Sequence, residues 1–214
     1  MTKKLSEYRY ELKYAIDPIA FSSFLHVLHL HPAGFKTTYP DRRVNNVYFD
    51  NLHFQSCQEN LSGISNRTKI RYRWYGDFEN FTDGKLEFKI KNNALGCKEY
   101  LELENPNSVP ELAKEVNEKL KRSDLFPSLI NSYNRSYYID NSNKFRLTVD
   151  HDVSYWLPNN FRNIDTPIFI DEKQIIEIKF DQENHKLFNA IASHFPFRLT
   201  KHSKYVNGIL NLVY

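Results

Sequence analysis

The sequence predicts an α+β fold in which about eight strands form a closed antiparallel β-barrel with helices packed outside. Segments that alternate between charged and apolar residues, the period of a strand, outnumber the helical segments. Strand–helix–strand alternation is absent, and turn residues join several strands directly, which favours antiparallel pairing. The aromatic share of 15% is high and also favours strands.

The composition indicates one soluble globular domain over residues 1–214. Hydrophobic residues make up 41% of the chain and charged residues 26%, and no linker or low-complexity segment divides it. There is no run of about 18 apolar residues, so we expect no membrane segment, and the N-terminus lacks the apolar core of a signal peptide. Cys57 and Cys97 are too few for a disulfide framework or a structural zinc site. We therefore expect a cytoplasmic protein.

The first half of the chain predicts three strands, one helix and a helical turn. Residues 8–14 alternate strictly between charged and apolar or aromatic side chains, as a strand does. An Asp-Pro pair then begins a helix over 17–31, with Phe and Leu at helical spacing on one face. A short strand over 44–49 and a helical turn over 54–63 follow, and the third strand spans 67–75.

The second half predicts five strands and two helices by the same criteria. The strands span 86–90, 97–104, 133–139, 145–150 and 174–180. Apolar residues at helical spacing predict the helices over 110–121 and 187–195. The segment from Thr200 onward carries no predicted element.

The strand over 67–75 carries three cations at alternate positions, Lys69, Arg71 and Arg73. On a strand these side chains share one face and follow each other at intervals of about 6.6 Å, twice the rise per residue. The residues between them are apolar or aromatic. For a single strand, the usual interpretation is a charged face turned to water.

The same alternation recurs in other strands, which favours a different interpretation. Glu-x-Lys stands at the centre of three strands, at Glu11/Lys13, Glu87/Lys89 and Glu177/Lys179. Six strands have one charged face, and their other face is apolar and suited to being covered by helices. If the helices pack outside, the charged faces point together into the barrel. An eight-stranded barrel is wide enough to hold one small ligand.

The charged residues expected in this interior contain more cations than carboxylates. They are Lys13, Lys69, Arg71, Arg73, Lys89, Arg135 and Arg146, against Glu11, Glu87 and Glu177. Confined cations repel each other, so such a set requires an anion. Arg offers planar forks that suit phosphate oxygens, and Lys offers a compact charge. A linear polyphosphate, whose charges repeat along a line, matches these rows.

A series of segments along the chain resembles a known family. They are Tyr-Glu-Leu-Lys-Tyr, Val-Tyr-Phe-Asp, Lys-Ile-Arg-Tyr-Arg-Trp-Tyr-Gly, Leu-Glu-Phe-Lys, Asn-Arg-Ser-Tyr-Tyr, Phe-Arg-Leu-Thr-Val-Asp, Ile-Glu-Ile-Lys-Phe and Lys-His-Ser-Lys-Tyr. The series resembles the VTC domain, the catalytic domain of the vacuolar transporter chaperone. That domain is a polyphosphate polymerase of the triphosphate tunnel metalloenzyme, or CYTH-like, superfamily. No single motif is specific, but the series covers essentially the whole chain.

The resemblance implies a triphosphate tunnel that transfers the γ-phosphate of ATP to a growing polyphosphate chain. The catalytic residues it implies are Arg71, Arg73, Lys89 and Glu177. The phosphate-binding residues it implies are Lys13, Arg71, Arg73, Lys89, Lys98, Arg135, Arg146, Lys201, Ser203 and Lys204. Glu177 would hold Mn²⁺ or Mg²⁺, with Glu11 as a second candidate ligand. Glu11 and Glu87 could instead neutralise neighbouring lysines.

One departure from the superfamily bears on the reaction. Its first strand carries Glu-x-Glu-x-Lys, and Arg9 stands here at the position of the first Glu. The missing carboxylate disfavours a typical tunnel hydrolase. The alternative enzyme is nevertheless such a hydrolase, a metal-dependent tripolyphosphatase or nucleoside triphosphatase that uses the same tunnel. A non-catalytic module that binds polyphosphate or tripolyphosphate is a further alternative. The phosphate-sensing domain and membrane helices of the eukaryotic complex have no counterpart in the sequence.

Two other classes of phosphate-binding protein fit the sequence poorly. The Gly-x-x-x-x-Gly-Lys-Ser/Thr motif of P-loop enzymes is absent. Nucleic acid is not expected as a partner, because the net charge is only +3 and the cations lie within strands rather than in one basic patch.

Overall fold

The computed structural model describes residues 8–81, 83–104, 106–158 and 166–213. The first seven residues, part of the segment searched for a signal peptide, lie outside these ranges. Nine strands form one sheet in which all neighbours pair antiparallel. In chain order they are β1 (Arg9–Ile16), β2 (Lys36–Asp50), β3 (Asn66–Tyr75), β4 (Lys85–Asn92), β5 (Leu95–Leu101), β6 (Phe126–Ile139), β7 (Arg146–Trp156), β8 (Phe169–Asp171) and β9 (Gln174–Asp181).

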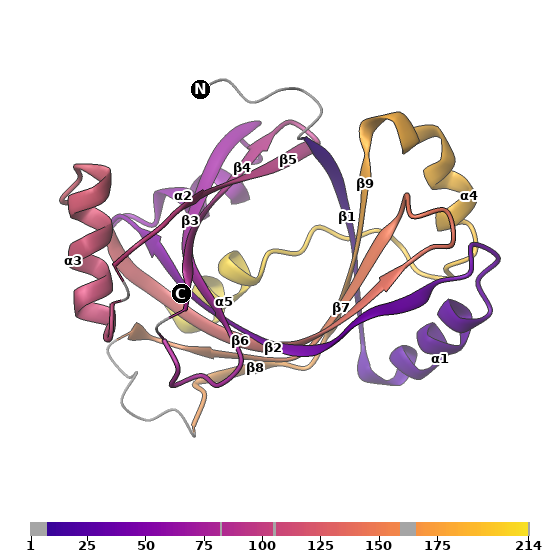
Figure 1. Ribbon diagram of the computed structural model, residues 1–214, viewed down its shortest axis with the longest axis horizontal. Coiled ribbons are helices and arrows are strands. Elements are labelled where there is room, and N and C mark those ends of the chain that lie inside the picture. Colours follow the sequence, from indigo (N-terminus) through magenta and orange to yellow (C-terminus); the bar gives the residue numbers. More distant parts are fainter. Residues whose placement is uncertain (1–7, 82, 105, 159–165, 214) are drawn as a thin grey trace.

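The sheet curves round into a ring (Figure 1). Its order is β6-β2-β3-β4-β5-β1-β9-β7, and β6 also pairs with β7, which closes eight strands on themselves. The short strand β8 is an addition that pairs with the C-terminal part of β7. The predicted closed antiparallel sheet of eight strands is therefore confirmed, as a ring with one extra strand at its edge.

The strand boundaries differ most from the prediction in β2, β6 and β7. β2 begins at Lys36 and β6 at Phe126, each seven or eight residues earlier than expected, and β7 continues to Trp156. The β2–β6 register shifts three times, and such irregularities place successive residues out of strict alternation. Pro40 and Pro127 also interrupt the pattern in these parts. The alternation that identifies a strand is therefore lost although the pairing continues.

The described residues form five α-helices and one 3₁₀ helix. They are α1 (Pro18–His29), α2 (Gln55–Leu61), α3 (Val109–Leu120), η3 (Gln182–Leu187), α4 (Phe188–Ala192) and α5 (Lys204–Leu212). Pro lies in the first turn of α1 and of α3, and Ser108 caps α3 by accepting a hydrogen bond from the Glu111 amide. None of the helices among these residues is long and apolar enough to cross a membrane.

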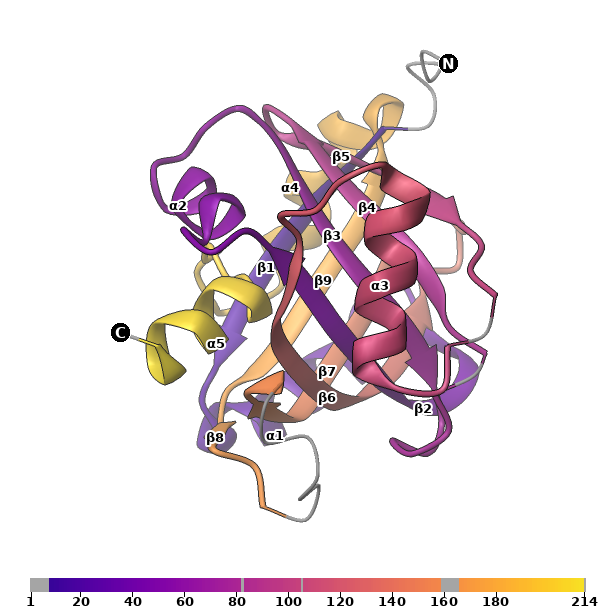
Figure 2. The same ribbon diagram turned by 90° about the vertical axis from the view of Figure 1, so that its left-hand side faces the viewer.

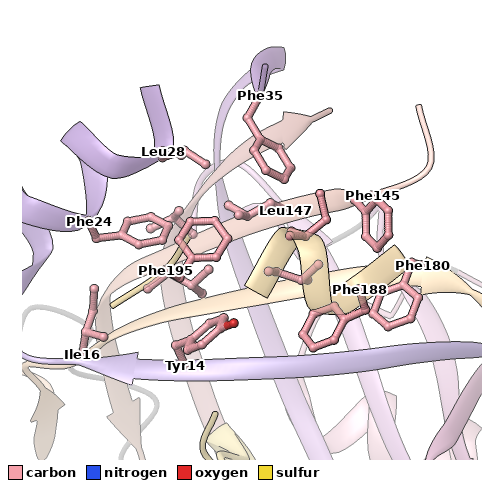
Figure 3. Packing of buried hydrophobic residues seen from close by; sticks show 14 residues of the cluster. Tyr14, Ile16, Phe24, Leu28, Phe35, Phe145, Leu147, Phe180, Phe188 and Phe195 are labelled. Atoms are coloured by element: carbon pink, nitrogen blue, oxygen red, sulfur yellow. The ribbon is translucent and has the colours of Figure 1, made fainter. Parts of the chain in front are cut away.

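The helices α1 and α4 cover the outer face of β1, β7 and β9 with an aromatic-rich cluster (Figure 3). Alternate strand residues contribute to it, and Tyr14, Leu147 and Ile178 are each at most 1% exposed. Phe24 of α1 stacks on Phe195 with ring centroids 5.5 Å apart. Because these rows of the strands pack outward, the charged rows between them face the interior of the ring.

The helix α3 covers the outer face of β2, β3 and β4 on the opposite side of the ring (Figures 1 and 2). Tyr72 and Trp74, which alternate with the cations of β3, are both 0% exposed. Their rings lie 5.1 and 4.8 Å from that of Phe81, and the Tyr72 hydroxyl donates to the Phe81 carbonyl. The alternation of β3 therefore sorts its side chains as predicted, with aromatic residues outside and cations inside.

The helix α5, which the sequence did not predict, packs on the inner side of the sheet rather than outside it. Its Tyr205 is buried in a cluster with Tyr48, Leu129 and Tyr155 of β2, β6 and β7, and the Tyr48 and Tyr205 rings stack at 5.0 Å. Tyr48 belongs to the inner face because its hydroxyl accepts a hydrogen bond from Arg71. In Figures 1 and 2, α5 lies across one end of the ring.

Gly208 allows α5 to lie this close to the sheet. A Cβ at this position would be 2.5 Å from Leu129 Cδ2 and 2.7 Å from Tyr155 Cδ1. Alanine usually stabilises a helix by about 1 kcal/mol over glycine, but here the added methyl overpacks the cluster. We expect Gly208→Ala to lower the free energy of unfolding by about 1–3 kcal/mol in urea denaturation.

Leu210→Ala is the matched control, because Leu210 lies on the same helix and is 42% exposed. It should change the free energy of unfolding by less than about 0.5 kcal/mol. A Gly208→Ala variant that is more stable than the parent would contradict the close packing of α5.

Candidate functional site

The strand register brings charged side chains of neighbouring strands together on the inner face of the ring. Lys69 of β3 lies opposite Lys89 of β4, and Arg71 lies opposite Glu87. Lys89 in turn lies opposite Lys98 of β5. Directly opposite residues in an antiparallel sheet have Cβ atoms about 4.5–5.5 Å apart. Pairing alone therefore crowds like charges and places a carboxylate among them.

Glu87 is the centre of the first charged group. Its Oε2 accepts a hydrogen bond from Arg71 Nε at 2.8 Å and also contacts Arg71 Nη2. Lys98 Nζ and Arg73 Nη1 lie 3.4 and 3.9 Å from the same oxygen. Burial would raise the pKa of Glu87, but Arg71, Arg73 and Lys98 hold it well below its ordinary value. The buried carboxylate therefore stays ionised.

Asp150 of β7 is the centre of the second group. Arg135 holds it with two hydrogen bonds, Nε to Oδ1 at 2.5 Å and Nη2 to Oδ2 at 2.7 Å. Lys204, at the start of α5, also contacts Asp150, and its Nζ lies 4.4 Å from the ring centre of Tyr133. Arg73 Nη2 donates to the Tyr133 hydroxyl at 2.9 Å. Burial would raise the pKa of Tyr133, but Arg135 and Arg73 lower it to about 8.

Glu177 of β9 and Glu11 of β1 form the third group. Lys13 Nζ lies 3.2 Å from Glu177 Oε2, and Lys179 contacts the other oxygen. Lys89 donates to Glu11 Oε2 at 2.6 Å. Burial would raise the pKa of both carboxyl groups, but the surrounding lysines hold both below their ordinary values. Both are therefore ionised near neutral pH.

Across these groups, eight cations share four carboxylates within the described part of the chain. Four carboxylates cannot offset eight basic groups, even where Lys98 is neutral, so the interior keeps an excess of positive charge. Lys98 shows the effect, because burial and then the nearby Arg71 and Arg73 lower its pKa to about 6. An interior of this kind is suited to binding a polyanion.

Lys69 differs from the eight cations because the partners of its ammonium group are neutral. Its Nζ donates to Asn60 Oδ1 of α2 at 2.7 Å and to Ser203 Oγ at 2.8 Å. Ser203 is the N-cap of α5. Burial, and then repulsion from Lys89, lower the pKa of Lys69 well below its ordinary value. Lys69 thus connects β3 to both helices at the end of the ring that α5 covers.

Two of the predicted phosphate ligands lie apart from these groups. Arg146 lies opposite Lys179 in the β7–β9 register, on the inward-facing row, but it is exposed. Lys201, in the segment before α5, is exposed as well. Over the residues that the structure describes, neither of them contacts a carboxylate. The structure gathers the other predicted residues, Lys13, Arg71, Arg73, Lys89, Lys98, Arg135, Ser203, Lys204, Glu11 and Glu177, on the inner face.

Four residues of the inner face were not predicted as part of a site. Asp150 lay on the expected charged face of its strand, and Lys179 completes a Glu-x-Lys pair, so alternation carried a signal for both. Tyr133 also shares the inward row of β6 with Arg135, but an aromatic residue in a strand gives no specific signal of a charged site. Asn46 accepts a hydrogen bond from Arg73 Nε at 2.8 Å, and a neutral amide within a strand gives no such signal.

The residues around Glu177 fit a divalent metal ion that is held jointly with phosphate. No group of three or more His, Cys, Asp or Glu residues able to hold a metal occurs in the described ranges. Glu11 and Glu177 lie close enough to influence each other's ionisation. Thr148 lies opposite Glu177, and its buried hydroxyl lacks a hydrogen-bond partner in the described structure. Mg²⁺ is commonly bound by one or two carboxylates together with substrate phosphates, and such a set of oxygen donors is present here.

A separate cavity of about 600 Å³ lies outside the ring, beside α2 and the start of β3. It is lined by outward residues such as Ile70 and Ile90, together with polar residues such as Gln55 and Arg122. None of the predicted phosphate or metal ligands lines it. We therefore place the candidate site on the inner face of the ring.

A model of the VTC domain family matches residues 8–213. The chain belongs to the VTC domain family. Subunit 4 of the vacuolar transporter chaperone complex of Trypanosoma cruzi is 24% identical to this VTC domain over an alignment of 251 residues. The alignment covers 86% of this chain and 31% of that subunit, so the chain spans about a third of its length. The family recognised in the sequence is thus confirmed.

Solved structures similar to this VTC domain share its fold at low sequence identity. A candidate adenylate cyclase from Vibrio parahaemolyticus has a TM-score of 0.55 and 12% identity, over 94% of this chain and 98% of that one. A candidate adenylyl cyclase from Hippeastrum, described as having a dominant triphosphatase activity, has a TM-score of 0.55 and 13% identity, over 97% of each chain. At these identities the likeness supports the ring fold alone.

The lowered pKa of Lys98 predicts that anion binding takes up protons. Between pH 6 and 10 the folded protein keeps Lys98 largely neutral while the unfolded chain protonates it, so this group makes stability rise with pH. A bound polyanion favours the ammonium form and raises that pKa. At pH 8 we expect tripolyphosphate binding to take up protons, seen as a binding enthalpy that depends on the ionisation enthalpy of the buffer.

Lys98→Met should reduce this proton uptake by up to one proton per site. Lys114→Met, on the exposed side of α3, is the control and should leave it unchanged. Equal binding enthalpies for the parent protein in phosphate-free buffers of different ionisation enthalpy would contradict the prediction.

Proposed function

We propose that the ring interior is a phosphoryl-transfer site that extends polyphosphate with the γ-phosphate of ATP in the cytoplasm. The observation that supports this proposal most is the sharing of four carboxylates by eight inward cations. Such an interior needs a polyanion rather than a single anion. Membership of the VTC family supports polyphosphate as that polyanion.

Phosphate would bind by taking the place of carboxylates beside the cations. Arg71 and Arg135 each hold a carboxylate through two guanidinium nitrogens. The same planar fork binds phosphate oxygens, whereas the inward lysines contribute point charges. Each bound phosphate also offsets repulsion between neighbouring cations. The carboxylates of the protein thus hold the inward cations at the positions where phosphate would bind.

The metal would be held between Glu177, Glu11 and the phosphate oxygens. A bound Mn²⁺ or Mg²⁺ would supply charge neutralisation at the phosphates undergoing transfer. Lys13 and Lys179 flank Glu177 and restrict where its carboxylate can lie. The two lysines would thus position Glu177 for the metal on one side of the phosphate chain. The arginines would hold phosphate oxygens on the other side.

The reaction requires neither a protein nucleophile nor a strong base. The acceptor is the terminal phosphate of the polyphosphate chain, which is already an anion. A bond forms between its oxygen and the γ-phosphorus of ATP, the bond from that phosphorus to the bridging oxygen breaks, and ADP leaves. The inward cations would contribute by aligning donor and acceptor and by stabilising the charge on the transferred group.

One assay separates this function from its alternatives. The protein, incubated with ATP and Mn²⁺, should form polyphosphate that runs as a ladder on a gel. The amount of phosphate incorporated into this polyphosphate should exceed the amount released as free phosphate. Free phosphate without a ladder identifies a tripolyphosphatase or nucleoside triphosphatase. Binding of polyphosphate without either product identifies a non-catalytic module.

Combining Arg71→Met with Glu87→Gln should reduce ladder formation at least about 100-fold, because a buried donor to the phosphates is lost. The second change matters because Arg71 is the nearest partner of the buried Glu87 carboxylate, and removing one partner of a buried ion pair typically costs about 3–5 kcal/mol. A melting curve checks that the variant is folded. Arg122→Ala is the control, because this arginine pairs with Asp124 outside the ring, and it should keep full activity. Full activity of the double variant would refute the site.

Metal binding should require phosphate and Glu177 together. Mn²⁺ that tumbles slowly on a protein increases the relaxation rate of water protons. The mixture of protein, tripolyphosphate and Mn²⁺ should therefore give a higher water-proton relaxation rate than any mixture of two of these components. Glu177→Gln should abolish this enhancement, and Glu172→Gln, at an exposed position after β8, should retain it. Undiminished enhancement in Glu177→Gln would place the metal elsewhere.

A further inference from the structure

Three of the rows of inward cations, those of β3, β5 and β6, end in tyrosines at the end of the ring opposite α5. On β3, Tyr75 takes the inward position that follows Arg73. On β5 and β6 the corresponding residues are Tyr100 after Lys98 and Tyr137 after Arg135. Lys69, at the other end of the β3 row, contacts the cap of α5, so Tyr75 lies at the end away from that helix.

Arg42 of β2 lies among these rings. Its guanidinium carbon is 5.5 Å from the ring centre of Tyr39, 6.0 Å from that of Tyr75 and 5.9 Å from that of Tyr137. The Tyr39 and Tyr137 rings meet edge to face at 5.8 Å. Over the described ranges Arg42 pairs with no carboxylate. We call this set the tyrosine collar; its members are Tyr39, Arg42, Tyr75, Tyr100 and Tyr137.

The collar exposes an unusual amount of aromatic surface for its position. Tyr39, Tyr75 and Tyr100 are 56%, 48% and 57% exposed, although the aromatic residues of the outer face of β3 are fully buried. Burial, and then the nearby Glu87 carboxylate, raise the pKa of Tyr100 above its ordinary value, and burial also raises that of Tyr137. These two phenols are therefore neutral and do not repel an approaching anion. The collar offers flat ring faces and one arginine directly beyond the last cations of these three rows.

We propose that the tyrosine collar binds the nucleobase of a nucleoside triphosphate whose phosphates lie along the cation rows. This inference rests on the proposed function and specifies how the donor nucleotide is held. Aromatic rings stack on heterocyclic bases, and arginine stacks on either, whereas bare phosphate gains nothing from a ring face. Because the collar continues the rows of Arg73, Lys98 and Arg135, one ligand can occupy both. A nucleotide has the base and the polyanion that this continuous surface matches.

The collar also gives the donor a direction. With the base among the tyrosines, the triphosphate points along β3 towards Lys69 and the end covered by α5. Stacking does not read the hydrogen-bonding edges of a base, so the collar should accept ATP and GTP with similar affinity. Tripolyphosphate lacks a base and should bind through the cation rows alone.

The test compares the affinities of ATP, GTP and tripolyphosphate by calorimetry in one buffer. Tyr75→Ala, Tyr100→Ala and Arg42→Ala are made singly, because each residue is exposed and its truncation leaves the outer clusters intact. Each tyrosine variant should weaken ATP and GTP at least about tenfold, within the range of one base–aromatic stack, and leave tripolyphosphate within twofold. Phe126→Ala is the control, since Phe126 is an exposed aromatic at the other end of the strand that carries Tyr137.

Two results would overturn the collar as a base site. One is equal weakening of ATP and tripolyphosphate, and the other is unchanged ATP affinity in all three variants. If the parent protein binds neither ligand, the proposed function fails and the inference fails with it. If the nucleotide-specific loss occurs while the ladder assay gives no polyphosphate, the collar holds and the polymerase is rejected.

Discussion

The confinement of more positive than negative charge within a closed ring is the constraint on which the structure depends. Eight cations share four carboxylates, and Lys69 adds a ninth basic group with neutral partners. Without the carboxylates, the repulsion between desolvated cations would oppose closure of the ring. With four carboxylates the ring closes, but its interior keeps an excess of positive charge that favours bound anions. The same ion pairs therefore bear on both the stability of the ring and the proposed binding of phosphate.

The outer clusters provide the stability that offsets this repulsion. Each strand sorts its residues by alternation, so a strand such as β3 places Tyr72 and Trp74 under α3 while Arg71 and Arg73 face inward. A shift of the register by one residue would exchange the two rows, burying cations among aromatic rings and exposing the rings to the interior. The large aromatic content thus holds the charged rows in register.

Alternation made most of this predictable from the sequence. It predicted the antiparallel closed sheet and, in segments such as the one from Lys69 to Trp74, the face that each side chain takes. It could not predict α5, because a Gly-containing helix of nine residues gains its stability from packing on the sheet rather than from its own sequence. Alternation also could not predict that Asp150 pairs with both Arg135 and Lys204, because Lys204 is distant from Asp150 in the sequence.

The carboxylates differ in how many cations they serve, and this difference bears on their roles. Among the residues that the structure describes, Glu87 pairs with three cations, whereas Glu11 pairs with Lys89 alone. A carboxylate held by three cations is already committed to neutralising them, and turning it towards a metal would leave all three unmatched. Glu11 would free a single lysine, which a phosphate could then accept as its partner. The arrangement therefore favours Glu11 over Glu87 as the carboxylate that would join Glu177 at the proposed metal site.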